Sequence, residues 1–254
     1  MRPSSFFGLL SIALIGALPL GCGDDGPTAL DDSTDGPTSP QGPQATPPNL
    51  APTAVAGPDQ SAECASHAGS TVTLTAAGSA DSDGQITLYE WFESGKRIAI
   101  GSTPTVTLAF GEHTIILRTT DDDGGTNDDV VVVNIRDTQA PTVAMVVSPA
   151  SLWPPNHTMH VVARGVTASD VCDPAPALSF AITSDEPENG LGDGDTAPDW
   201  AVQPSGASLA DVLVRAERSG LGNGRVYTIR ATAVDRAGNG SSAATGTVTV
   251  PHNQ

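Results

Sequence analysis

The sequence has few positive charges. It contains 11 Lys and Arg residues against 29 Asp and Glu residues, and its formal net charge is −18 over 254 residues. Such an acidic chain repels the phosphate backbone of DNA and RNA, so we exclude nucleic-acid binding. The acidity instead favours solubility, cation binding or both.

Aromatic and charged residues are also scarce. Aromatic residues make up 4% of the chain and charged residues 16%, whereas there are 27 glycines and 21 prolines. This amount of turn-forming residue argues against a helical protein. It favours short strands joined by many turns.

The N-terminal apolar run lacks the length of a transmembrane helix. Residues 6–20 form a run of fifteen residues after Arg2, which matches the hydrophobic part of a secretory signal. Leu20, Gly21 and Cys22 then resemble the lipobox of a bacterial lipoprotein signal, which implies that Cys22 is lipidated and becomes the mature N-terminus. An ordinary cleaved signal with an incidental cysteine is the alternative. Because Gly23 stands where an inner-membrane retention signal has Asp, the resemblance favours an outer-membrane or cell-surface anchor.

Residues 23–49 lack basic and aromatic residues altogether. They contain five aspartates and six prolines. Such a segment cannot bury enough apolar surface to offset its chain entropy, so we expect a disordered, extended linker between the anchor and the folded domains.

Short alternating apolar runs begin at about residue 50. We expect strands at 71–75, 86–92, 105–110, 113–119 and 130–135, separated by turn residues as in an antiparallel sandwich. Tyr89 and Trp91 should lie in the core of this sandwich. A second set is expected at 142–147, 158–166, 177–183, 208–218, 225–235 and 245–250.

Ordered motifs in the first set resemble a PKD (polycystic kidney disease) domain over residues 50–136. They are N-L-A-P at 49–52, A-G-P-D-Q at 56–60, G-S-A-D-S-D-G at 78–84, Y-E-W at 89–91, G-E-H-T at 111–114 and D-D-D-G-G at 121–125. The resemblance implies an immunoglobulin-like sandwich of the kind found in extracellular bacterial proteins.

Residues 137–254 form a second predicted domain. The segments L-W-P-P-N-H at 152–157, C-D-P-A-P at 172–176 and G-D-G-D-T-A-P-D-W at 192–200 are similar to a module associated with PKD-type and HYR-like repeats. The segment V-D-R-A-G-N at 234–239 resembles the closing turn of bacterial immunoglobulin-like repeats. We therefore predict an all-β chain with two tandem immunoglobulin-like sandwiches.

Clustered carboxylates suggest calcium. Ca²⁺ takes six to eight oxygen ligands, and packed aspartates otherwise repel one another. The resemblance to calcium-binding PKD domains implies Asn49, Asp81, Asp83 and Asp121 or Asp122 as ligands, although plain turn capping explains the same residues. Asp193, Asp195 and Asp199 form a second candidate set, and Asp137, Asp170 and Asp235 near the domain boundary form a third.

Two cysteines remain beyond Cys22, one in each predicted domain. Export suggests an oxidising compartment, where Cys64 and Cys172 could bridge the domains or stay as separate buried thiols.

Nothing in the sequence favours catalysis. Serine, histidine and acidic residues do not occur at a recognisable catalytic spacing, and His157 and His160 have no identifiable third zinc ligand. We predict a non-enzymatic surface lipoprotein that displays two sandwiches for adhesion or protein contact, with membrane association only through its lipid.

Two alternatives to this prediction stay open. One is an extracellular polysaccharide-binding module that uses Trp200, with Trp153 expected as a core residue. The other is a structural spacer.

Overall fold

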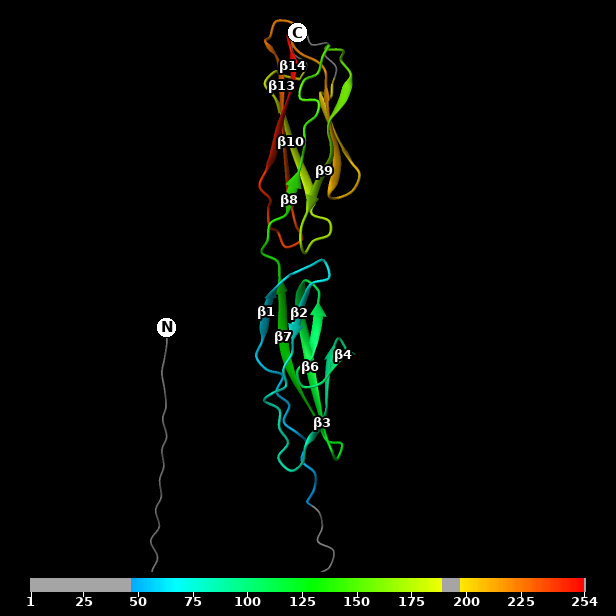
Figure 1. The fold of residues 1–254 in the computed structure, drawn as a ribbon, viewed down its shortest axis with the longest axis vertical. Helices are drawn as coiled ribbons and strands as arrows, with labels where there is room; N and C mark the ends of the chain where they lie inside the picture. The colour runs from blue at the N-terminus through cyan, green and yellow to red at the C-terminus, as the bar shows by residue number, and fades with distance from the viewer. Residues whose placement is uncertain (1–46, 189–196, 254) are drawn as a thin grey trace, which may run out of the picture. The chain divides into compact units, whose positions relative to one another are not determined.

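The computed structural model describes residues 47–188 and 197–253 (Figure 1). In this part of the chain every regular element is a β-strand, which confirms the predicted all-β class. Residues 47–254 form one compact unit by their internal contacts. Cys22, the linker up to Thr46, Asp193 and Asp195 lie outside the described residues.

Seven strands form the first sandwich. One sheet has the order β1-β7-β6-β3-β4 and the other pairs β2 with β5. Their bounds are β1 Gln60–Glu63, β2 Ser70–Thr73, β3 Ile86–Glu93, β4 Lys96–Ile100, β5 Thr105–Leu108, β6 Gly111–Asp121 and β7 Thr126–Arg136. β1 runs parallel to β7, whereas the other pairs are antiparallel.

Alternation along the strands builds the first core. Ile115 and Leu117 on β6 are fully buried, as their spacing predicts, and Trp91 on β3 packs with them. The indole Nε1 of Trp91 donates a hydrogen bond of 2.9 Å to the Gly101 carbonyl. Tyr89, two residues earlier, is partly buried against the same core.

The second sandwich contains strands β8 to β14. Its sheets have the orders β11-β12-β9-β8 and β10-β13-β14. The bounds are β8 Thr142–Ala144, β9 Met159–Ser169, β10 Ala177–Ser184, β11 Trp200–Pro204, β12 Leu209–Arg215, β13 Gly224–Val234 and β14 Ala244–Pro251. Alternate residues of β13, among them Tyr227 and Ile229, face a core shared with β12 and β14.

Three strands were not expected from the sequence, namely β1, β4 and β11. All three lie at the edge of a sheet. An edge strand is held by main-chain bonds to one neighbour, so its side chains need not alternate between core and solvent. β4 illustrates this, because Lys96 and Arg97 are exposed and Ile100 is 55% exposed.

Candidate functional site

A disulfide joins the two sandwiches. Cys64 follows β1 and Cys172 follows β9, and their Cα atoms lie 5.7 Å apart. Both residues are 2% exposed, and Cys172 packs within the core cluster of the first sandwich. A residue of the second sandwich therefore completes the core of the first. Sequence alone left this bridge open, because only folding brings the two Cα atoms within bonding range.

Other contacts surround the disulfide. The ring nitrogen Nε2 of His67 donates to the Asp170 carbonyl at 3.0 Å. The guanidinium of Arg236 lies 5.1 Å from the ring centre of Phe110, which is a cation–π geometry. We call this set of contacts, together with the disulfide, the joint.

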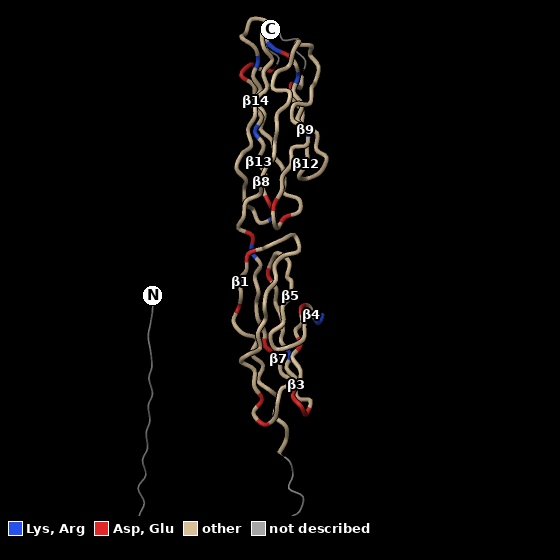
Figure 2. Tube along the Cα trace, viewed as in Figure 1, with Lys and Arg blue, Asp and Glu red and all other residues tan. Residues whose placement is uncertain are grey.

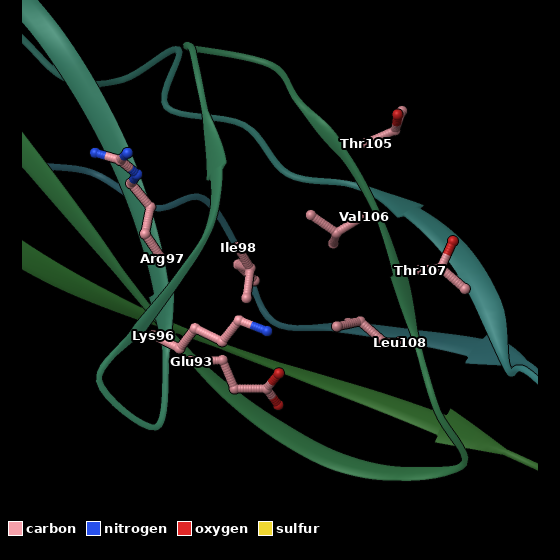
Figure 3. Close-up of a pocket in the computed structure, with 8 residues that line it drawn as sticks. All are labelled: Glu93, Lys96, Arg97, Ile98, Thr105, Val106, Thr107 and Leu108. Carbon is pink, nitrogen blue, oxygen red and sulfur yellow. The ribbon is translucent and has the colours of Figure 1, made fainter.

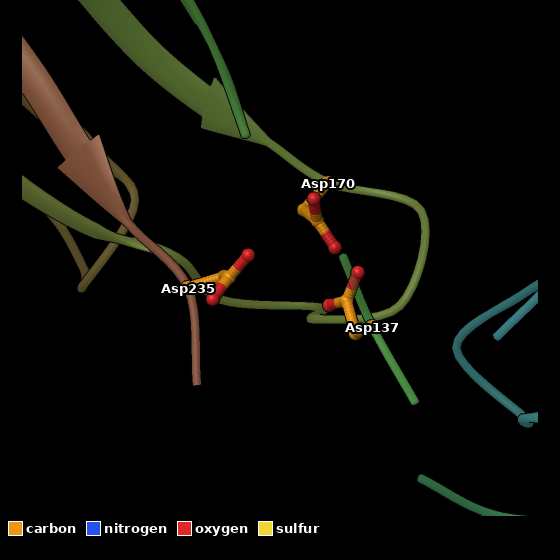
Figure 4. A group of neighbouring side chains, drawn as sticks. All are labelled: Asp137, Asp170 and Asp235. Carbon is orange, nitrogen blue, oxygen red and sulfur yellow. The ribbon is translucent and has the colours of Figure 1, made fainter. Parts of the chain in front are cut away.

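Three carboxylates meet at the joint, as Figure 4 shows. Asp137 follows β7, Asp170 follows β9 and Asp235 follows β13. Each offers one oxygen within 4.8 Å of an oxygen of the other two. Burial, and then the charges of Asp170, Asp235 and Glu63, raise the pKa of Asp137.

Backbone amides hold these carboxylates in place. Asp170 Oδ1 accepts hydrogen bonds of 2.8 Å from the amides of Cys172 and Asp173. Asp235 accepts from the amide and the side-chain nitrogen of Asn239. The side-chain nitrogen of Asn239 also donates to the Asp137 carbonyl at 3.0 Å, so the turn after β13 is tied to the segment that connects the sandwiches.

The five residues implied by the PKD resemblance gather at one end of the first sandwich. The side chain of Asn49 donates to Asp121 Oδ2 at 2.9 Å, and the amide of Leu50 donates to Asp83 Oδ2 at 3.1 Å. Asp121 Oδ1 accepts from the amides of Asp123 and Gly125. The hydrogen bond from Asn49, followed by these backbone bonds, lowers the pKa of Asp121.

This end of the sandwich fits calcium only in part. Asp81 Oδ2 is buried without a hydrogen-bond partner, and it lies near Asp122 Oδ1 across the backbone of Gly84. Both oxygens of Asp121, by contrast, already accept hydrogen bonds. Asp121 therefore acts as a turn cap, and calcium binding here stays a prediction.

Asp199 is not the exposed loop ligand that the sequence suggested. Its side chain is fully buried, and its Oδ2 lies 2.5 Å from Arg225 Nη1. Arg225 also donates to the Tyr227 hydroxyl and to the Pro187 carbonyl. Burial lowers the pKa of Arg225, but the bonds and charges of Tyr227 and Asp199 outweigh it and raise that pKa above its usual value. Burial also raises the pKa of Tyr227 to about 12. A buried cation needs its anion for folding, so we assign Asp199 a structural role.

The same network organises the motifs that the sequence singled out in this domain. Arg215 donates to the carbonyls of His157 and Pro198, and so links the L-W-P-P-N-H segment to the end of the acidic loop. Glu186 accepts from the amide of Ser219 at 2.6 Å. The separation of Arg215 and Arg225 in the sequence did not predict that their side chains belong to one network.

Trp91 lies in the core as expected, whereas Trp153 does not. Trp153 is 44% exposed, and Leu152 is the core residue of its segment at 4% exposure. Trp200 is only partly exposed and packs against the second core. The expectation that Trp153 fills the core is therefore wrong, because the strand-free L-W-P-P-N-H segment turns Leu152 inward and leaves its neighbour outside.

A shallow groove of about 400 Å³ lies in the first sandwich (Figure 3). It is bordered by the edge strands β4 and β5, with Glu93, Lys96 and Thr107 among its polar residues. Arg97 at its rim forms an ion pair with Glu90. Acidic residues, red along the tube in Figure 2, far outnumber basic ones in the sequence, so the two adjacent basic residues Lys96 and Arg97 at this groove are unusual.

Comparisons with known proteins identify the first sandwich. The PKD domain family matches residues 49–135, so this part of the chain contains a PKD domain. The PKD1 domain of Vibrio anguillarum Epp is a similar solved structure, with 25% identity and a TM-score of 0.28, covering 35% of this chain and 100% of that one.

Two longer likenesses cover both sandwiches. Cadherin domains 1–4 of protocadherin gamma B7 match with 14% identity and a TM-score of 0.35, over 79% of this chain and 49% of that one. A structure of carbohydrate-binding modules from the β-sandwich superfamily matches with 15% identity and a TM-score of 0.32, over 74% of this chain and 58% of that one. No curated protein matches the sequence.

Proposed function

We propose that this chain is a non-enzymatic, exported surface lipoprotein that displays two coupled immunoglobulin-like sandwiches for contact with an extracellular protein. The observation that carries the proposal is the joint, where a buried disulfide connects the two sandwiches. Disulfides form and persist in oxidising compartments outside the cytosol. PKD domains, such as that at residues 49–135, are typical of extracellular and surface proteins and are generally non-catalytic.

The connection between the sandwiches suits the binding of a partner protein rather than catalysis. Two rigidly connected domains present their loops and sheet edges in a defined relation, which lowers the entropy lost when a partner binds both. The edge strand β4 offers unpaired main-chain groups and two exposed basic side chains, Lys96 and Arg97. An acidic extended segment of a partner would match this edge by strand addition.

The envelope location is tested in cells. The chain, carrying its own signal, is expressed in a Gram-negative host, and intact cells are treated with protease before and after permeabilisation. We expect the chain to be membrane-bound and digested on intact cells, whereas Cys22→Ala should release it into the soluble fraction. Protection of the wild-type chain until permeabilisation would contradict surface display.

Contact is tested on the displayed protein. Cells that display the chain are compared for attachment to one another and to host-matrix proteins with cells that carry Cys22→Ala. We expect attachment to fall when the anchor is lost and when Lys96 and Arg97 are both changed to Glu. Equal attachment of all three strains would contradict the contact function.

The exposed Trp153 favours polysaccharide binding as a second candidate. Its segment is held by backbone bonds, since the amides of Asn156 and His157 both donate to the Ala216 carbonyl. A fixed, exposed aromatic ring is the feature on which a sugar stacks. We expect Trp153→Ala, but not Trp200→Phe, to abolish any signal on a glycan array, and the absence of signal from the wild-type chain would remove this candidate.

A further inference from the structure

The five-stranded sheet of the first sandwich carries apolar side chains on its solvent face. A sheet that has one face in water normally alternates apolar and polar residues along each strand. β7 instead has four consecutive valines at 130–133. Val131 and Val133 are fully buried in the core, whereas Val130 is 50% exposed. A continuous apolar run of this kind is typical of a strand that is covered on both faces.

β6, which lies beside β7 in Figure 1, extends this apolar area. Ile116 is paired with Val130 across the two strands and is 36% exposed. Its neighbours along β6, Ile115 and Leu117, are fully buried, so Ile116 faces away from the core. On its other side, Ile116 is paired with Phe92 of β3, which is partly exposed. Three apolar residues therefore form a row across the middle of the solvent face, and a contiguous row of this kind indicates an interaction surface.

A row of charged residues lies beside the apolar row. Glu90, Arg118 and Asp128 are cross-strand neighbours on β3, β6 and β7. Arg118 Nη2 lies 2.7 Å from Asp128 Oδ2, and the Arg118 guanidinium lies 5.7 Å from the ring centre of Phe92. The outward-facing charged residues of β6 and β7 are two acids and two arginines, namely Glu112, Asp128, Arg118 and Arg136. This face is therefore neutral, although the whole chain has a formal net charge of −18.

The pairing of β6 with β7 makes this face complementary to itself. A two-fold axis that runs between the two strands, parallel to them, places β6 of each copy against β7 of the other. Ile116 then meets the partner's Val130, and Arg118 meets the partner's Asp128. The other outward pairs also oppose no like charges, namely Thr114 with Val132 and Glu112 with Asn134. Two acidic chains can therefore approach each other here without like charges facing one another.

We propose that two copies of this chain bind each other through the solvent faces of β6 and β7. Because the face is neutral and its opposite charges match across the axis, a second copy fits it better than a partner whose surface carries charge of one sign. Two strands offer fewer residues than the roughly 20–30 a side of a standard interface, so the contact is weak and reversible. The inference adds a partner to the contact function proposed above, and it rests on that function only for its role on cells.

Sedimentation velocity of the purified full chain, in density-matched detergent, tests the contact in solution. Salt is kept at about 0.15 M, where repulsion between distant charges is screened. The wild type is compared with Ile116→Glu, which places a charge in the apolar row. Leu221→Glu is the matched control, because it adds the same charge at a residue that is 93% exposed in the second sandwich. Thermal melts check that each variant is folded.

We expect the wild type and Leu221→Glu to dimerise with a dissociation constant on the order of 10⁻⁵ M, as suits a small interface. Ile116→Glu should raise that constant by at least about tenfold, because association would bury an unpaired charge. Its melting temperature should stay close to that of the wild type, since the side chain is already partly in water.

Exchange of the charges at Arg118 and Asp128 tests the two-fold arrangement itself. Arg118→Asp sets two acids against each other across the axis, and Asp128→Arg sets two arginines against each other. Each variant alone should dimerise at least about tenfold more weakly than the wild type. An equimolar mixture should recover dimers, because both contacts of a mixed pair then join opposite charges.

Three outcomes would overturn the proposal. One is a wild type that stays monomeric at about 10⁻³ M, a hundred times the expected constant. Another is a dimer that Ile116→Glu leaves unchanged, which would assign the contact to a different surface. The third is a mixture of the two charge variants that associates no better than either alone. None of these results bears on the protease test of surface display, so failure of self-association and failure of the proposed function are distinguishable.

Discussion

The two sandwiches share an architecture but differ in what they bury. The first buries apolar side chains around Trp91, and its ion pair between Arg118 and Asp128 is exposed to solvent. The second buries an ionic network, in which Arg225, Asp199 and Glu217 have fully buried side chains. Two sandwiches of one class can therefore be stabilised in different ways. The first is stabilised mainly by the apolar area that it removes from water, and the second also requires its buried charges to stay paired.

The largest effect is expected from breaking the covalent link between them. The disulfide spans 108 residues of sequence, and closing a loop of that size stabilises a protein by about 4–5 kcal/mol in the chain-entropy model. We expect the wild type to melt in one calorimetric transition and the Cys64→Ala/Cys172→Ala variant to melt in two. A single unshifted transition in the variant would mean that the other contacts of the joint suffice to couple the sandwiches.

Removing the buried cation should have the next largest effect. Arg225→Ala leaves Asp199 buried without its partner, and breaking such a pair costs about 3–5 kcal/mol. Urea unfolding in the cysteine-free background would show this loss in the transition of the second sandwich. Arg118→Ala is the matched control, because its ion pair with Asp128 is exposed to solvent and should contribute little to stability. Equal losses of stability in Arg225→Ala and Arg118→Ala would contradict the difference between the buried ion pair of the second sandwich and the exposed pair of the first.

A cavity in the first core should destabilise only the first sandwich. Leu117 is fully buried on β6, and Leu→Ala at such sites costs about 2–5 kcal/mol. The same urea experiment on Leu117→Ala should move one transition and leave the other in place. If both transitions moved in the cysteine-free background, the remaining contacts of the joint would be shown to transmit stability.

The smallest expected effect concerns pH and the first sandwich. Burial lowers the pKa of His113, but hydrogen bonds to Glu93 and to the Ala109 carbonyl outweigh it and raise that pKa above 6.5. A raised folded-state pKa means that the added stability is complete below pH 6.5 and is lost as the pH rises through the folded value. The pair should contribute less than about 1 kcal/mol to the free energy of unfolding. Urea unfolding between pH 5.5 and 8.5 should show a weaker dependence of that free energy on pH in Glu93→Gln than in the wild type. An identical slope in the variant would show that the pair does not set it.

The sequence predicted the interior of each sheet better than its edges. Alternation located β6 and β13 because their inward residues must be apolar. It missed β4 and β11, which are held by one neighbouring strand and carry no such pattern. Trp153 shows a related limit, because composition cannot tell which member of an irregular segment turns inward.

Aspartate spacing was equally indecisive. Each of the three candidate sets consists of turn-forming aspartates, and their local patterns do not distinguish a cap from a ligand. Asp199 proved to be the partner of a buried arginine 26 residues away in sequence. Asp137, Asp170 and Asp235, spread over nearly 100 positions, lie within 4.8 Å of one another.

The sequence by itself determined the all-β class and the PKD character of residues 49–135, since both follow from local periodicity and short ordered motifs. Only the tertiary structure decided the pairing of Cys64 with Cys172, the burial of Asp199 against Arg225 and the meeting of three aspartates at the joint. The reason is physical. Local patterns reflect the pleat and the turn, which extend over a few residues, whereas these contacts join segments that become neighbours only when the sheets pack.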